Sequence, residues 1–223
     1  MHQAIGNVLA FAVVVAVSPI NIMAAILLLF SARPIAGASA YLVGFAAGVA
    51  AVLVALEILA AHLDLSDGSD PSRGAAVLRI VLGIALLAAA GRKVRARRSA
   101  TGDAELPGWM SGISELAPPK AAATGLLIGA LNPKNLAMAV AASLVIGAAS
   151  LSGSQTATVI AVYVVVASLG VAAPLVVTLA LGDRSEAVLA GWRSWLARNN
   201  DAVMAVVYLL FGVVLVGNGI ASL

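Results

Sequence analysis

Six long apolar runs constrain what this chain can fold into more than any other feature of its sequence. They cover residues 4–30, 36–62, 73–92, 120–150, 154–181 and 201–221. Apolar runs of about 20 residues or more cross a hydrocarbon core of about 30 Å as helices, because a helix pairs its own backbone groups where no water is present. With 62% hydrophobic and 10% charged residues, the chain is predicted to be an all-α polytopic membrane protein with six transmembrane helices.

Nothing in the chain resembles the active site of a soluble enzyme. The chain has no cysteine, which excludes a disulfide framework and a thiolate metal site. Its two histidines, His2 and His62, lie near predicted helix ends, and there is no zinc-protease, P-loop or dinucleotide-binding motif. We therefore expect no enzymatic activity, no cofactor and no metal site.

The basic residues are distributed unevenly between the two sides of the predicted helices. If the six runs alternate across the membrane, ten lysines and arginines fall on one side: Arg33, Arg92, Lys93, Arg95, Arg97, Arg98, Lys120, Arg184, Arg193 and Arg198. The positive-inside rule then places both termini outside and the 92–119 linker in the cytoplasm. The run "RKVRARR" is accordingly interpreted as an orientation signal with contacts to anionic lipid, not as a nucleic-acid patch.

Two polar signatures interrupt the apolar runs in the same way. Residues 18–21 read "SPIN" and residues 132–135 read "NPKN", and the segment "LGIALL" from Leu82 resembles "FGVVLV" from Phe211. Because each half has three runs, an odd number, the second half must enter the membrane from the opposite side. This predicts two inverted three-helix repeats with helices 1 and 4 broken, an arrangement common among secondary transporters. The expected organisation is a first repeat at 1–92, a linker with a short interfacial helix at 93–119, and a second repeat at 120–223.

Each proline should break its helix near the middle. Pro19 and Pro133 have no N–H for the carbonyls of Val15 and Gly129, and proline disfavours helical geometry in the preceding residue. The freed carbonyls need partners, and nearby polar side chains could serve only that structural purpose. Two breaks that meet could instead enclose a polar substrate site. The candidate residues are Ser18, Pro19, Asn21, Asn132, Pro133 and Asn135.

Lys134 is the most unusual residue in this set. It lies near the middle of the fourth run, where a lysine costs on the order of 3 kcal/mol on insertion scales and usually faces a cavity or a partner. An amine beside a helix N-terminus suits an anion such as phosphate, sulfate or carboxylate. The alternative is that Lys134 snorkels to the cytoplasmic surface.

The remaining polar features have structural interpretations. Glu57 and Arg79 should lie within about two turns of the outer face, where they could form an ion pair or a gate. "GFAAG", residues 44–48, is a small-xxx-small helix-packing pattern. Interfacial segments are expected around Trp109 and around Trp192 and Trp195, because tryptophan favours the headgroup level.

The order of these elements resembles the bacterial GAP/Sap family, the glycopeptidolipid- and sulfolipid-addressing proteins, within the wider LysE-type transporter superfamily. The matching stretches are "SPINIMAAILLLFSARP", "AYLVGFAAGVA", "LAPPKAAATGLLIGALNPKNLAMAVAAS" and "WLARNNDAVMAVVYLLFGVVLVGNGI". The resemblance implies a multi-pass inner-membrane protein that helps to move envelope lipids or glycolipids toward the cell surface. It implies a substrate role only for the residues of the two Pro-Asn signatures.

Two other functions stay open on the sequence alone. One is export of small solutes, as in LysE-type proteins, which requires an enclosed water-filled site. The other is a membrane scaffold that docks onto a larger lipid-export machine through the 92–119 linker and the tryptophan segments. Membrane lipids with anionic or glycolipid headgroups are the expected partners, nucleic acid is not expected, and a homodimer stays open.

Overall fold

The computed structural model describes residues 2–62, 71–99, 110, 112–149 and 151–223. Within these ranges the backbone is helical apart from short turns, and no strand occurs in them. The prediction of an all-α protein is therefore confirmed.

Proline begins five of the α-helices. The helices are α1 (His2–Ala16), α2 (Pro19–Leu29), α3 (Pro34–His62), α4 (Pro71–Ser99), α5 (Pro118–Leu131), α6 (Pro133–Gly147), α7 (Gly153–Leu181) and α8 (Ser185–Ile220), with 3₁₀ turns η2 (Ile113–Glu115) and η3 (Gly182–Arg184). Proline suits the first helical position because an N–H at that position would have no acceptor within the helix, and because the φ of proline is already helical. α7 instead begins with a capping box, in which Ser152 and Gln155 each bind the other's backbone N–H.

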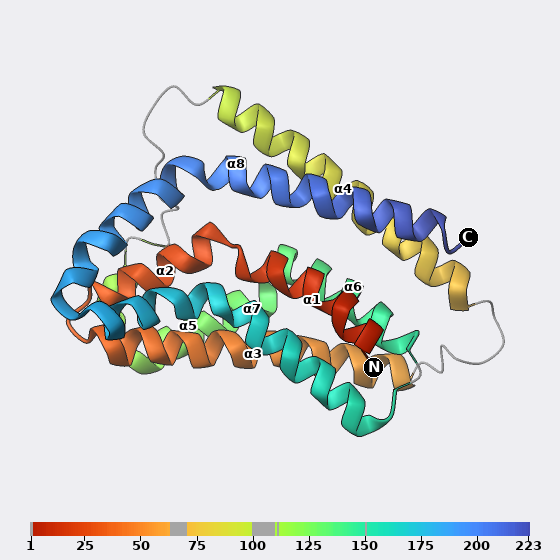
Figure 1. Cartoon of the computed structure of the whole chain (residues 1–223), viewed down its shortest axis with the longest axis horizontal. Coiled ribbons are helices and arrows are strands. Elements are labelled where there is room, and N and C mark those ends of the chain that lie inside the picture. Colours follow the sequence, from red (N-terminus) through yellow and green to blue (C-terminus); the bar gives the residue numbers. More distant parts are fainter. Residues whose placement is uncertain (1, 63–70, 100–109, 111, 150) are drawn as a thin grey trace. The chain divides into compact units, whose positions relative to one another are not determined.

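Both predicted helix breaks occur at the expected prolines. The first apolar run divides into α1 and α2, which meet at an angle of 54°, and the fourth divides into α5 and α6 at Asn132. Ser18 and Asn132 both have extended backbone, with φ −112° and ψ 103° for Ser18 and φ −65° and ψ 121° for Asn132. This is the conformation that a following proline favours. Figure 1 shows α1 and α2 in red at the first of these breaks.

Several helices are long and apolar enough to cross a membrane. Among the described residues these are Pro34–Leu59 of α3, Arg73–Ala96 of α4 and the stretch Gly153–Ile220, which comprises α7, η3 and α8. The bent pair α1 and α2 could form a further span. α6 is apolar but only 15 residues long. The chain is thus a helical membrane protein, while the count of six spans stays a prediction.

The C-terminal helix is longer than the sequence pattern indicated. We expected an interfacial segment around Trp192 and Trp195 followed by a separate span from residue 201, but α8 runs from Ser185 to Ile220 without interruption. The physical reason is that no glycine or proline lies between Gly191 and Gly212 to end the helix. α4 likewise continues through its basic end to Ser99.

The chain forms two compact units. The first comprises residues 1–57 and 105–197, and the second comprises residues 58–104 and 198–223. The predicted division into repeats at 1–92 and 120–223 is a different kind of division, based on internal similarity, and it stays a prediction.

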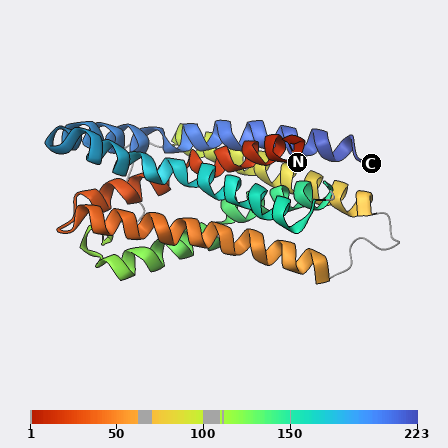
Figure 2. The same cartoon turned by 60° about the horizontal axis from the view of Figure 1, so that its bottom comes forward.

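In the first unit, glycines bring α3 and α5 into backbone contact. A Cβ added at Gly44 or Gly48 would overlap the carbonyl oxygen of Ala122 or Leu126, and Gly125 and Gly129 of α5 are equally close to the backbone of α3. The contacts advance in the same direction along both helices, so α3 and α5 run parallel, as Figure 2 shows. The packing role predicted for Gly44 and Gly48 is confirmed, and a second small-xxx-small pair on α5 completes the interface.

A similar contact joins α7 to α1 in the same unit. Gly170 of α7 lies against the carbonyl oxygen of Ala16, at the end of α1, so closely that an added Cβ would overlap it. α7 also packs against α2 beyond the break. One glycine therefore lets a long unbroken helix pass along both halves of the broken one.

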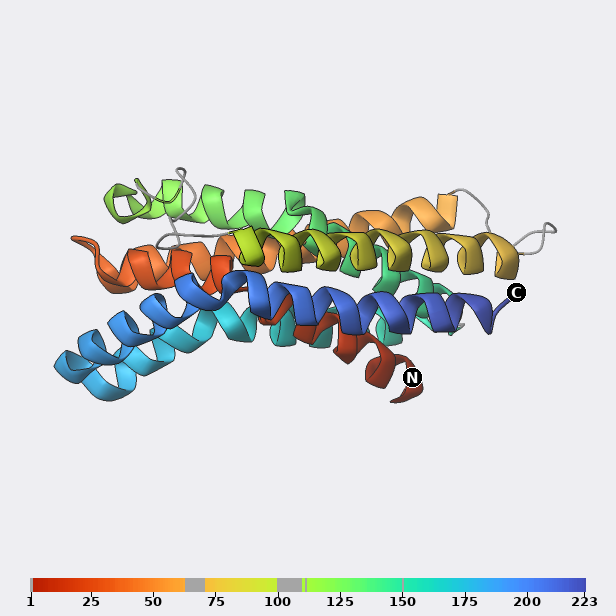
Figure 3. The same cartoon turned by 90° about the horizontal axis from the view of Figure 1, so that it is seen from above.

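In the second unit, the described part of α4 runs antiparallel to the end of α8 (Figure 3). Gly83 and Gly212 face each other, with a built Cβ at Gly83 lying 2.8 Å from the Gly212 oxygen and a built Cβ at Gly212 lying 3.0 Å from the Gly83 oxygen. A salt bridge of 2.8 Å joins Lys93 Nζ to Asp201 Oδ1. The two segments that the sequence suggested were counterparts thus pack directly on one another.

The linker is described only in part. Trp109, the expected anchor of an interfacial helix, lies outside the described residues. Beyond it, Ile113–Glu115 form the single 3₁₀ turn η2, which packs on α2. Met110 and Ile113 are buried, each 2% exposed.

Candidate functional site

The first helix break frees two backbone carbonyls in the interior of the first unit. Pro19 has no N–H to give to the carbonyl of Val15. The N–H of Ser18 would bind the carbonyl of Val14 in a continuous α-helix, but here it binds Ala16 O at 2.9 Å. The carbonyl of Val14 therefore loses its helical donor. Both valines are 1% exposed, so their carbonyls need a partner from elsewhere in the protein.

Lys134 supplies that partner from the second break. Its Nζ donates to Val14 O at 2.8 Å and to Val15 O at 3.4 Å, and the residue is 5% exposed. It reaches the carbonyls because α1 packs against α6, on which Lys134 is the second residue. Lys134 is therefore buried, and in this structure it does not snorkel.

The second break is held by side chains of its own segment. Asn132 Oδ1 accepts a hydrogen bond of 3.0 Å from the N–H of Lys134 and so caps α6. Asn135 Nδ2 donates to Ile128 O at 3.1 Å and to Gly129 O at 3.4 Å. These are the two carbonyls that Asn132 and Pro133 leave without helical partners, so both receive a donor from within the same segment.

The first break differs in its own polar residues. Asn21 follows Pro19 by two positions, as Asn135 follows Pro133. Within the described structure, neither amide atom of Asn21 has a hydrogen-bond partner, although the residue is only 1% exposed. Ser18 makes no capping hydrogen bond to α2. Lys134 thus does at the first break what Asn135 does at the second, and Asn21 is left unused.

Other buried polar atoms also lack partners in the described part of the chain. In the first unit they are Oδ1 of Asn135 and the hydroxyl oxygens of Tyr41 on α3 and of Tyr163 and Ser168 on α7. Both tyrosines are 0% exposed. Buried polar groups are normally hydrogen-bonded, so unpaired hydroxyls in the unit that contains both breaks indicate a polar interior with spare hydrogen-bonding capacity.

The two other charged residues that we singled out have separate partners. Glu57 Oε1 accepts a hydrogen bond of 2.6 Å from Ser143 Oγ on α6. Arg79 Nη1 is 3.4 Å from Ser222 Oγ near the C-terminus. The two residues belong to different compact units, and the ion pair or gate between them stays a prediction.

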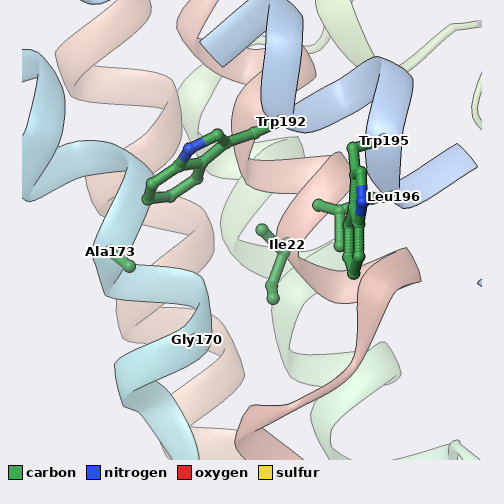
Figure 4. Close-up of a pocket in the computed structure, with 6 residues that line it drawn as sticks. All are labelled: Ile22, Gly170, Ala173, Trp192, Trp195 and Leu196. Carbon is green, nitrogen blue, oxygen red and sulfur yellow. The ribbon is translucent and has the colours of Figure 1, made fainter. Parts of the chain in front are cut away.

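An apolar cavity lies beside the first break. It has a volume of about 350 Å³ and is lined by Ile22 of α2, Gly170 and Ala173 of α7, and Trp192, Trp195 and Leu196 of α8. Figure 4 shows the two indole rings on either side of Ile22. Both tryptophans are also partly exposed, 38% for Trp192 and 52% for Trp195, so the cavity is bounded by side chains that reach the surface of the unit.

The structure thus brings some of the predicted site residues together. Lys134 of the second break binds the backbone of the first, and Asn132, Pro133 and Asn135 surround its own break. Sequence reasoning missed the buried tyrosine hydroxyls and the apolar cavity. Among the described residues no cluster of histidine, cysteine or carboxylate side chains could hold a metal ion.

Comparison with known proteins agrees with the family that the sequence resembles. Comparisons with curated proteins and with solved structures give no match. Residues 8–221 match the family described as Sap, sulfolipid-1-addressing protein. That match extends from α1 to the end of α8 and includes both helix breaks. The chain therefore belongs to the Sap, sulfolipid-1-addressing protein family.

Proposed function

We propose that this protein transports an envelope lipid across the bacterial inner membrane toward the cell surface, with the lipid headgroup bound between the two helix breaks. The family name refers to the addressing of a sulfolipid, which supports a role with lipids. The observation that carries the proposal is the bond network of Lys134, whose Nζ joins one broken helix to the other. Broken helices that meet are where secondary transporters bind their substrates.

In the proposed topology the chain crosses the membrane six times. The pairs α1 with α2 and α5 with α6 each form one broken span, α3, α4 and α7 form one span each, and the part of α8 after residue 200 forms the last. Both termini lie outside, because the basic end of α4 should be cytoplasmic.

Internal similarity supports an inverted repeat. α3 and α7 share a pattern in which Tyr41 and Gly48 correspond to Tyr163 and Gly170. Each of these glycines makes a close contact with the first half of a broken helix, Gly48 with α5 and Gly170 with α1. The contact of α3 with α5 is thus the counterpart of the contact of α7 with α1, as a repeat symmetry requires.

The ammonium of Lys134 gives the proposed headgroup site its charge. The N-terminus of α6 lies beside it, and both favour an anionic group. The amides of Asn21 and Asn135 and the hydroxyls of Tyr41 and Tyr163 would bind the polar part of the headgroup. Each of these residues has at least one buried atom without a partner in the described structure.

The apolar cavity beside the break is proposed to hold part of an acyl chain. Ile22 lines it and follows Asn21 directly in α2, so a chain there would lie close to the helix that carries the headgroup site. Trp192 and Trp195 bound it, and tryptophan side chains favour the membrane interface. The acyl chains would otherwise remain in the bilayer at a lateral opening.

The test is lipid export in cells with Lys134→Ala, alongside Lys120→Ala as a control. Both variants remove one lysine from the same broken span, but Lys120 is exposed at the start of α5. We expect export to be lost in Lys134→Ala and retained in Lys120→Ala. Normal export by Lys134→Ala protein would show that the site is wrongly assigned. If lipid export is lost only when residues 95–115 are deleted, the result would favour a membrane scaffold. A phenotype confined to soluble compounds would favour an exporter of small solutes.

A further inference from the structure

The two helix breaks have the same local sequence plan but different hydrogen bonding. In the second break the amide of Asn135 binds the carbonyls that lie seven and six residues before it, those of Ile128 and Gly129. The residues seven and six positions before Asn21 are Val14 and Val15. Their carbonyls are the ones that Lys134 holds.

Asn21 therefore has two carbonyls at the same sequence spacing as the two acceptors of Asn135, but Lys134 already binds them. Its amide is buried, and among the described residues both of its polar atoms lack a partner. An unpaired buried amide is costly, and Asn21 has the same sequence spacing to these two carbonyls as Asn135 has to its own acceptors. The position that corresponds to Lys134 in the first signature is Ile20, which has no side-chain donor. A lysine and an asparagine can therefore compete for the same pair of carbonyls at the first break but not at the second.

We propose that Asn21 and Lys134 compete for the carbonyls of Val14 and Val15, and that the exchange presents the Lys134 ammonium to an anionic lipid headgroup. In the observed state Lys134 holds the carbonyls, and Asn21 has no hydrogen-bond partner among the described residues. In the other state Asn21 Nδ2 donates to them, as Asn135 does to its own pair, and Lys134 is released. The first break then has the same bonding as the second.

This exchange explains how a lysine that is only 5% exposed serves a substrate site. The carbonyls hold the ammonium until the substrate arrives, so the charge is never left without a partner in the membrane. The first break is not left unsatisfied when Lys134 leaves, because Asn21 takes its place. Asn21 is thus a positioning residue, which binds the carbonyls of the first break while Lys134 binds lipid. This role in lipid binding rests on the proposed function.

A double-mutant cycle in unfolding equilibria tests the exchange independently of transport. Asn21→Ala should lower the ratio of folded to unfolded protein by less than about threefold when Lys134 is present, because Asn21 donates no hydrogen bond to any described residue in this state. In a Lys134→Met background the same change should lower it by about thirtyfold or more, since Asn21 then provides the remaining donor. Equal effects in the two backgrounds would overturn the exchange.

A crystal structure of the Lys134→Met variant provides a second test if the double variant does not fold. Asn21 Nδ2 should lie within hydrogen-bond distance of Val14 O or Val15 O, and an amide that stays unpaired would overturn the exchange.

The amount of anionic lipid that co-purifies with Asn21→Ala protein tests the role in lipid binding separately. If the effects of the two substitutions on stability are coupled but the lipid content is unchanged, the exchange holds and its role in presenting Lys134 to a headgroup is refuted.

Discussion

The unequal roles of Asn135 and Asn21 lead to a direct prediction for protein stability. Replacing Asn135 with leucine keeps the side-chain size but removes the donor to Ile128 O at 3.1 Å and to Gly129 O at 3.4 Å. An unsatisfied buried polar group costs about 1–3 kcal/mol. The longer bond is weak, so the expected loss is about 2 kcal/mol, or roughly 30-fold in the folding equilibrium.

Asn21→Leu is the matched control, because it removes an equivalent amide that has no hydrogen-bond partner in the described structure. It should leave the free energy of unfolding unchanged or raise it, since an unpaired buried amide is replaced by an apolar group. The assay is equilibrium unfolding of the purified variants in mixed micelles with increasing SDS. If Asn135→Leu is as stable as Asn21→Leu, the asymmetry between the two breaks is wrong.

Three further predictions concern packing, charge and the cavity. Gly125→Val should destabilise the protein by about 3 kcal/mol or more, because the added carbons overlap the backbone of α3, whereas Gly6→Val, with open space around it, should cost under about 1 kcal/mol by the same unfolding assay. Lys93→Ala should cost less than about 1 kcal/mol, because its salt bridge to Asp201 is about a third exposed, and a loss of several kcal/mol on thermal unfolding would contradict this. Ala173→Leu should fill the apolar cavity and reduce co-purified lipid measured by mass spectrometry while the folded yield stays unchanged, and undiminished lipid would refute the acyl-chain assignment.

The positions of the two breaks could be predicted because proline acts locally. Pro19 and Pro133 each lack the N–H that would continue the preceding helix, and Ser18 and Asn132 have the extended conformation that a following proline favours. The family resemblance was likewise visible in the two Pro-Asn signatures and is confirmed by the match over residues 8–221.

The bonding of the polar residues could not be predicted in the same way. Asn21 and Asn135 have the same position relative to a proline. Within the described part of the chain, however, the amide of Asn21 has no partner and that of Asn135 donates twice. The difference arises from Lys134, whose acceptors lie about 120 residues earlier in the chain and become neighbours only when α6 packs on α1. A sequence pattern gives the list of donors and acceptors but not the choice among them.

The cavity and the continuity of α8 also depend on more than one segment. Ile22, Gly170 and Trp192 come from three helices, and no pattern within one segment indicates that they share a cavity. The tryptophans suggested an interfacial segment separate from the last span, but helix propensity continued through them because no residue between Gly191 and Gly212 ends a helix.

The central claim is that Lys134 and the two broken helices form a binding site for an anionic lipid headgroup. The most direct test is to purify the wild type and Lys134→Ala in mild detergent and to identify co-purified lipids by mass spectrometry. A defined anionic lipid or glycolipid that is enriched in the wild type and lost in Lys134→Ala is the predicted result. The same bulk membrane lipids in both samples would contradict the claim.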